Sequence, residues 1–110
     1  MKKDDLIYVD HILDSIKKIE KYTDNLTIHV FVENELIQDG VIRNFEIIGE
    51  ATKHLSKDFR NNYSDIPWKQ IAGMRDILIH DYLGIDIYAV WETIESNLPR
   101  LKKQLLQIKK

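Results

Sequence analysis

The 110 residues suffice for one hydrophobic core, so we expect a single domain over residues 1–110. With 44% hydrophobic and 31% charged residues, the composition is that of a globular protein, and no segment approaches the roughly 18 apolar residues of a membrane span. The lack of cysteine excludes disulfides and thiolate chemistry and fits a cytoplasmic location, and a formal net charge of −2 means that any nucleic-acid contact needs a local basic patch.

Apolar residues recur at helical spacing through most of the chain, and two prolines and four glycines supply few helix breakers. The first helix is predicted to begin at a cap on Asp4 or Asp5 and to fade into a loop over 22–25. A shorter helix is predicted over 28–38, although its β-branched residues suit a strand as well.

The segment 40–57 has the clearest helical pattern in the chain, with an apolar stripe along one side. Gly40 leaves the start of this helix undecided, because glycine is a poor helix former. Gly49 lies inside the helix and indicates the close approach of a neighbouring helix. The polar stretch 58–67 predicts the main loop.

The second half of the chain predicts two more helical regions. Pro67 suits the first turn of a helix that runs through His80 and ends near Gly84. Asp86 is expected to cap the next helix, whose apolar residues keep one phase to the C-terminus.

Pro99 interrupts this last helical pattern and leaves two interpretations open. One is a single kinked helix, and the other is two nearly collinear helices with Ser96 or Asn97 capping the second. Together these elements predict an all-α, up-and-down bundle of four or five helices.

The stretch RDILIHDY, from Arg75 to Tyr82, carries side chains that a packed core does not need. On a helix, Asp76 and His80 would share a face, whereas Arg75 and His80 would lie about 140° apart. Arg75 and His80 would therefore converge if the helix loosened after Ile79, or if a second protomer supplied one of them. An arginine that holds a phosphate and a histidine that moves a proton are the equipment for metal-free RNA cleavage. The spacing alone also allows a surface ion pair of Asp76 with His80.

Three longer segments extend this short pattern into a family resemblance: RNFEIIGEATKHLS, IPWKQIAGMRDILIHDY and VWETIESNLPRLKKQL. They resemble the central helix, the active-site helix and the last helix of the HepT-like proteins of the HEPN superfamily. The family motif Arg-x4-His-x-Tyr is matched by Arg75, His80 and Tyr82. These proteins are toxin partners of MntA-like minimal nucleotidyltransferases.

The resemblance implies an all-helical homodimer and a metal-independent endoribonuclease toxin of a type VII-like toxin–antitoxin pair, without a cofactor. Arg75 and His80 would be the catalytic pair, with Asp76 in a supporting role, and RNA would be the substrate. An MntA-like nucleotidyltransferase antitoxin would neutralise the toxin by transferring AMP to Tyr82. An alternative is a non-catalytic helical subunit that presents a groove to the nucleotidyltransferase, and a third possibility is a plain structural dimer.

Residues outside the stretch from Arg75 to Tyr82 are also candidates for contacts to RNA, a metal or a nucleotide. Lys53, Lys57 and Lys69 are candidates for RNA contacts, although aspartates interrupt the basic strip. No metal-ligand spacing links the histidines, and no glycine-rich phosphate loop predicts ATP binding by this chain. Trp68 and Trp91 are expected in the core or in a dimer contact, and Tyr88 is expected to be packed, although a tyrosine there could also stack on a base.

Overall fold

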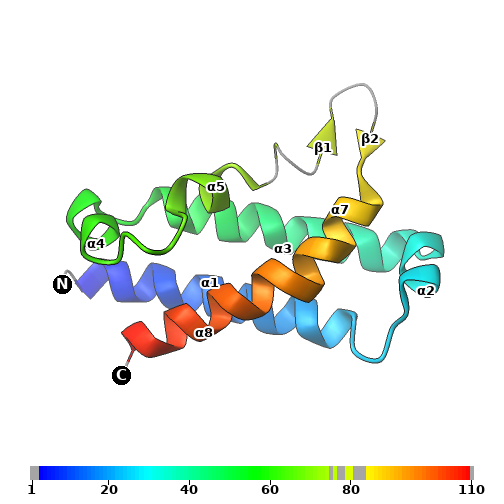
Figure 1. The fold of residues 1–110 in the computed structure, drawn as a ribbon, viewed down its shortest axis with the longest axis horizontal. Helices are drawn as coiled ribbons and strands as arrows, with labels where there is room; N and C mark the ends of the chain where they lie inside the picture. Colours follow the sequence, from blue (N-terminus) through cyan, green and yellow to red (C-terminus); the bar gives the residue numbers. More distant parts are fainter. Residues whose placement is uncertain (1–2, 75, 77–78, 81–83, 110) are drawn as a thin grey trace.

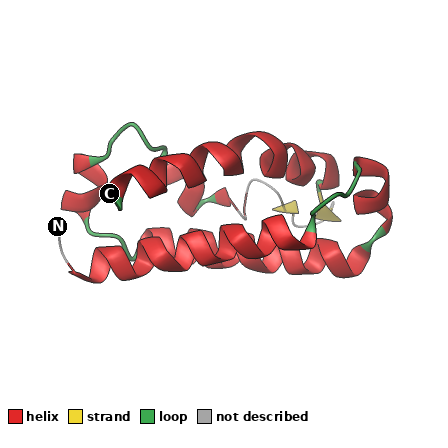
Figure 2. Cartoon of the chain, turned by 90° about the horizontal axis from the view of Figure 1, so that it is seen from below, coloured by secondary structure: helices red, strands yellow, loops and turns green. Residues whose placement is uncertain are grey.

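A computed structural model describes residues 3–74, 76, 79–80 and 84–109, and it is helical almost throughout (Figures 1 and 2). Its helices are α1 (Lys3–Tyr22), α2 (Ile28–Glu33), α3 (Glu35–Lys53), α4 (Lys57–Asn62), α5 (Trp68–Ala72), α7 (Ile87–Glu92), the π-helix η1 (Thr93–Asn97) and α8 (Leu98–Ile108). Two short strands, β1 (Ile79–His80) and β2 (Gly84–Ile85), form an antiparallel pair. The all-α prediction is confirmed, with a small β-ribbon that the sequence did not predict.

The two longest helices, α1 and α3, run antiparallel and form the base of the bundle (Figure 1). At one end Tyr8 stacks on His54, with ring centroids 5.1 Å apart. At the other end the ring of Tyr22 lies over Gly40, where a β-carbon would stand only 3.2 Å from it. The apolar stripes of both helices face inward and are fully buried at Val9, Ile12, Ile16, Val41, Phe45 and Ile48.

The helix break before α3 lies at Asn34, inside the helix predicted over 28–38, so that single short helix is wrong. The boundary that the sequence left undecided near Gly40 falls at Asn34 instead. The side chain of Asn34 caps α3 by accepting a hydrogen bond from the Ile37 N–H at 3.0 Å. Gln38 then donates to the carbonyl oxygens of Phe31 and Val32, both at 2.8 Å, and so binds the free end of α2. Side-chain caps at Asn34 therefore decided the boundary, and Gly40 stays inside the helix because it makes room for a tyrosine ring.

Asp5 does not cap α1, as one alternative had predicted, but joins α1 to α4. Its carboxylate accepts from the N–H and the hydroxyl of Ser56, both at 2.8 Å, and Asp5 is only 2% exposed. The Ser56 hydroxyl also accepts from the N–H of Phe59 and caps α4. Residues 58–62 of the predicted loop are therefore helical, because this shared cap satisfies the first turn of α4.

The short helix α5 packs directly on α3. A β-carbon at Gly49 would stand 3.1 Å from the backbone oxygen of Ala72, which confirms the predicted close approach at Gly49. Trp68 is buried, as expected, and its indole N–H donates to the carbonyl of Tyr63 at 3.1 Å. The helix ends at Gly73, whose N–H bonds back to Lys69 and Ile71.

The C-terminal elements α7, η1 and α8 form one continuous helical rod with a π-turn before Pro99 (Figure 1). Leu98 donates its N–H to the carbonyl of Thr93, five residues back, and α8 has no side-chain cap. Pro99 has no N–H, and a proline ring clashes with the carbonyl four residues earlier, so the turn widens. The kinked-helix interpretation is confirmed, and capping by Ser96 or Asn97 is wrong.

Charged side chains fasten α8 along α1. Lys102 contacts Glu20 at 2.9 Å, and Lys109 contacts Asp10. Trp91 of α7 meets Phe31 of α2, with ring centroids 5.2 Å apart, so both tryptophans contribute to the core. Within the part of the chain that the structure describes, no helix combines the length and the apolar composition needed to cross a membrane.

Candidate active site

The β-ribbon stands where the sequence predicted a continuous helix. Ile79 pairs with Ile85 and His80 pairs with Gly84, so the backbone at His80 is extended. Gly84 has a φ of +80°, a conformation that glycine adopts without steric cost. Figure 1 shows the ribbon rising away from the bundle between α5 and α7. The predicted helix through His80 is wrong, and the shared helical face of Asp76 and His80 is therefore lost.

The predicted catalytic residues lie largely outside the described part of the chain. Arg75, Tyr82 and the side chain of His80 are not among the described residues. Asp76 is helical and exposed, one turn before the ribbon. The roles assigned to these four residues therefore stay predictions. What the structure adds is the path of the backbone before and after them.

The candidate segment runs from Arg75 to Ile85, and the chain is packed into the bundle on both sides of it. On the entry side, Met74 is only 8% exposed and belongs to the hydrophobic core. On the exit side, Val90 of α7 is fully buried in the core. The side chain of Asp86 begins this helix by accepting from the N–H of Ala89 at 3.0 Å, which confirms the predicted cap of α7. A loop held at both ends by a packed scaffold is a common arrangement for catalytic residues.

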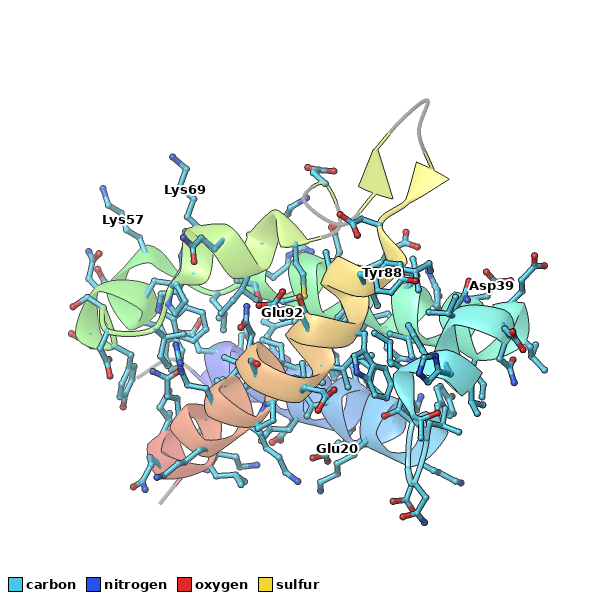
Figure 3. All side chains as sticks on the ribbon, turned by 45° about the vertical axis from the view of Figure 1, so that its right-hand side comes forward. Glu20, Asp39, Lys57, Lys69, Tyr88 and Glu92 are labelled. Carbon is cyan, nitrogen blue, oxygen red and sulfur yellow. The ribbon has the colours of Figure 1, made fainter. Side chains whose placement is uncertain are left out.

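Two of the predicted RNA-contact lysines lie on the same side as the ribbon. Figure 3 shows Lys57 of α4 and Lys69 of α5 projecting toward the side from which β1 and β2 extend. Lys53 is also exposed, but its ammonium lies 4.0 Å from Glu50. All three lysines are exposed to solvent, which suits screened attraction to a polyanion better than a tight phosphate site.

Tyr88 and two of the histidines lie outside the segment that holds the motif, and the structure describes their surroundings. Tyr88 of α7 is 66% exposed, so the expectation that it is packed is wrong. His11 and His54 both contact the ring of Tyr8 at the start of the bundle, and His54 lies 3.7 Å from Glu50. Among the described residues, no three His, Cys, Asp or Glu side chains are grouped to hold a metal ion.

A pocket that the sequence did not reveal opens beside the candidate segment. It has a volume of about 470 Å³ and lies between α5 and the η1–α8 part of the C-terminal rod. Its lining joins Gln70 and Met74 to residues that follow more than twenty positions later, including Asn97 and Arg100. The available sequence signal was Pro99, because the π-turn before this proline supplies part of the wall.

Comparisons with known proteins place these features in a family. A family model described as Ribonuclease HepT-like matches residues 12–108. The chain is 37% identical over 110 residues to the "Probable ribonuclease HepT" of Thermococcus cleftensis, and the alignment covers 100% of both chains. It is 42% identical over 101 residues to a protein named as a putative RNase from Caldanaerobacter subterraneus, which covers 92% of this chain and 90% of the relative.

A third relative is larger than this chain. It is a Methanocaldococcus jannaschii protein named as a gamma-glutamylcyclotransferase and putative RNase, 49% identical over 108 residues. The alignment covers 98% of this chain but 49% of that protein, so the chain spans about half the length of this relative. No solved structure matches the chain. Because the family model covers nearly the whole chain and full-length relatives exceed 30% identity, this chain belongs to the family of HepT-like ribonucleases.

Proposed function

We propose that this protein is an endoribonuclease that cleaves RNA without a metal ion, with Arg75 and His80 as its catalytic pair. The observation that carries the proposal is the family match over residues 12–108, which includes the whole Arg-x4-His-x-Tyr motif. The extended backbone at His80 supports it further. An extended segment is freed from the helical geometry that would hold Arg75 and His80 about 140° apart.

The proposed reaction is an internal transfer at one phosphodiester. His80 takes the proton of a ribose 2′-OH, and the 2′-oxygen then forms a bond to the adjacent phosphorus while the bond from phosphorus to the 5′-oxygen breaks. The leaving 5′-oxygen takes a proton from a water molecule, and His80 later returns the 2′-OH proton to the resulting hydroxide, which leaves a 5′-OH end and a cyclic 2′,3′-phosphate. Arg75 stabilises the negative charge that grows on the phosphoryl oxygens, and Asp76 supports the charged form of His80.

The proposal includes assembly and control in the cytoplasm. Two copies of the chain form a homodimer and bring their motifs to a common cleft. A separate MntA-like nucleotidyltransferase antitoxin transfers AMP from ATP to the hydroxyl of Tyr82, with release of pyrophosphate. The added phosphate carries negative charge two residues from His80 and seven from Arg75 in the sequence, and in the proposed cleft it repels or displaces the RNA phosphate.

RNA cleavage with and without EDTA tests the catalytic proposal. The wild-type protein should cut single-stranded RNA equally in both conditions, and His80→Ala should leave the RNA intact. Loss of wild-type cleavage in EDTA would refute metal independence. Intact RNA with the unmodified wild-type protein would favour the non-catalytic subunit instead.

Mass spectrometry tests the modification. After incubation with the nucleotidyltransferase and ATP, the peptide that contains Tyr82 should gain the mass of one AMP, and Tyr82→Phe should gain none. AMP on Tyr63 or Tyr88 would refute the placement. Unchanged inhibition of Tyr82→Phe by the partner and ATP would show that control runs through another contact.

A further inference from the structure

The pocket between α5 and the C-terminal rod has an apolar floor and a polar rim. Its floor is made by four buried side chains: Ile71, Met74, Leu98 and Leu101. Around this floor stand six polar side chains: Asp65, Gln70, Thr93, Asn97, Arg100 and Gln104. A volume of about 470 Å³ lies within the usual range of small-molecule sites.

The chemistry of the rim narrows the class of ligand. One cation, Arg100, and one anion, Asp65, nearly cancel, so the pocket does not attract a group with several phosphates. The other four polar side chains are neutral amides or a hydroxyl, which both donate and accept hydrogen bonds. An apolar side chain from a protein partner would cover these groups and leave them unpaired. A flat heteroaromatic ring with polar edges satisfies both the floor and the rim.

The pocket also lies next to the candidate catalytic segment in the chain. Met74, in its floor, is followed directly by Arg75, and consecutive α-carbons are about 3.8 Å apart. The α5 side of the pocket is held firmly, because α5 packs on α3 at Gly49 and Trp68 is hydrogen-bonded to Tyr63. A ring bound there is therefore at a fixed position relative to the start of that segment.

We propose that this pocket binds one unstacked nucleobase of the RNA, beside the phosphate that is cleaved, and so sets the sequence preference of cleavage. The base would lie on the Met74 and Leu101 side chains, while Gln70 and Asn97 would contact its polar edge. Arg100 would contact a backbone phosphate at the mouth. This proposal rests on the ribonuclease function proposed above.

Mapped cleavage of single-stranded RNA tests the pocket. The cleavage positions in a mixed-sequence RNA are determined first, and four short RNAs are then compared that differ in the nucleotide beside one position. The test variant combines Gln70→Ala with Asn97→Ala, and the control combines Gln107→Ala with Asn61→Ala, which are exposed and lie outside the pocket. All four changed residues are exposed, so thermal unfolding should match the wild type.

The wild type should prefer one base over the poorest by about tenfold or more, the discrimination typical of contacts to a base edge. The pocket variant should cut the preferred RNA about tenfold more slowly and lose most of this preference, while the control variant keeps both. A wild type without preference, or a pocket variant that keeps it, would overturn the pocket proposal and leave the ribonuclease intact. A pocket variant that keeps its base preference but changes the monomer–dimer equilibrium would overturn the proposal and indicate that a second copy of the chain occupies the pocket.

Binding of an uncleavable RNA separates this proposal from the proposed activity. Four short RNAs that differ at one nucleotide and carry 2′-O-methyl groups throughout lack a free attacking hydroxyl at every position, and fluorescence anisotropy reports their binding. If the wild type cuts no RNA, the ribonuclease proposal fails on its own. Base-selective binding that weakens about tenfold in the pocket variant would still support the pocket, and its absence would overturn it.

Discussion

The α1–α3 helix pair and the β1–β2 ribbon differ in length and in their position in the molecule. The two long helices bury continuous apolar stripes against each other and hold Phe45 and Ile16 completely out of solvent. The ribbon is two residues long on each strand and extends from the bundle (Figure 1). A two-stranded pair of this size contributes little stability of its own.

Under the proposed function, this difference would separate stability from chemistry within one small chain. Substitutions in the bundle should change the free energy of unfolding and leave the chemistry of folded molecules intact. Substitutions in the segment from Arg75 to Tyr82 should change the chemistry and leave unfolding nearly intact. The four predictions below test this division in order of decreasing effect.

His80→Ala and Arg75→Ala should each reduce the rate of RNA cleavage by about 10²–10⁴-fold, because each removes a group that acts on the transition state. Their melting temperatures should stay near the wild-type value, as measured by circular dichroism. Unfolding of His80→Ala would instead identify His80 as a core residue and end its catalytic assignment.

Phe45→Ala should lower the free energy of unfolding by about 3–5 kcal/mol, because it removes a fully buried aromatic ring from α3. Urea unfolding measures the change, and Leu36→Ala on the same helix is the control, since Leu36 is 82% exposed and should have little effect. Cleavage per folded molecule should be preserved. Selective loss of activity in folded Phe45→Ala would show that the bundle and the ribbon are coupled.

Asp5→Ala should destabilise the protein by about 2 kcal/mol, because two hydrogen bonds from Ser56 to a carboxylate are lost and α4 loses its tie to α1. Asp4→Ala is the matched control, since Asp4 is an exposed neighbour near the same helix start. It should cost less than about 1 kcal/mol through the helix dipole. Equal losses of stability in the two variants would mean that the contact between Asp5 and Ser56 adds nothing beyond the effect of a charge near the helix start.

Alanine at the two helical glycines of α3 should act in opposite directions by about 1 kcal/mol. Gly40→Ala gains helix propensity, and the partly exposed ring of Tyr22 can move aside. Gly49→Ala meets the backbone oxygen of Ala72 at 3.1 Å, so α5 must shift as a unit. Thermal unfolding gives the sign of each change. Stabilisation by Gly49→Ala would show that α5 is less firmly seated than the packing implies.

The sequence predicted the helices whose buried stripes are long. Residues of α1, α3 and α8 repeat their apolar side chains over several turns, and this repeat depends on the geometry of the helix alone. The Asp86 cap and the Gly49 contact were also predictable, because each follows from the chemistry of one residue. For the candidate site, the sequence predicted the motif residues Arg75, His80 and Tyr82.

The features that the sequence did not predict depend on which of several possible partners a residue contacts. Asp5 and Ser56 are 51 positions apart, and nothing near either residue indicates their contact. The residues around Ile79 suit a helix as well as a strand, and pairing with Ile85 decides between them. Gln70 and Asn97 line the same pocket although they lie far apart in the chain, so no local pattern indicates that they meet there.

By itself, the sequence determined the helical character of the chain and which ionisable side chains stand between positions 75 and 82, because periodicity and residue chemistry are local properties. Only the tertiary structure decided that the helix ends before His80, that Asn34 and not Gly40 divides two helices, and that a polar-rimmed pocket adjoins Met74. The pocket comes from packing between segments far apart in the chain, whose free energy is gained only when the whole chain is folded. The ribbon and the Asn34 cap use hydrogen bonds between residues a few positions apart, which compete with the continuation of a helix.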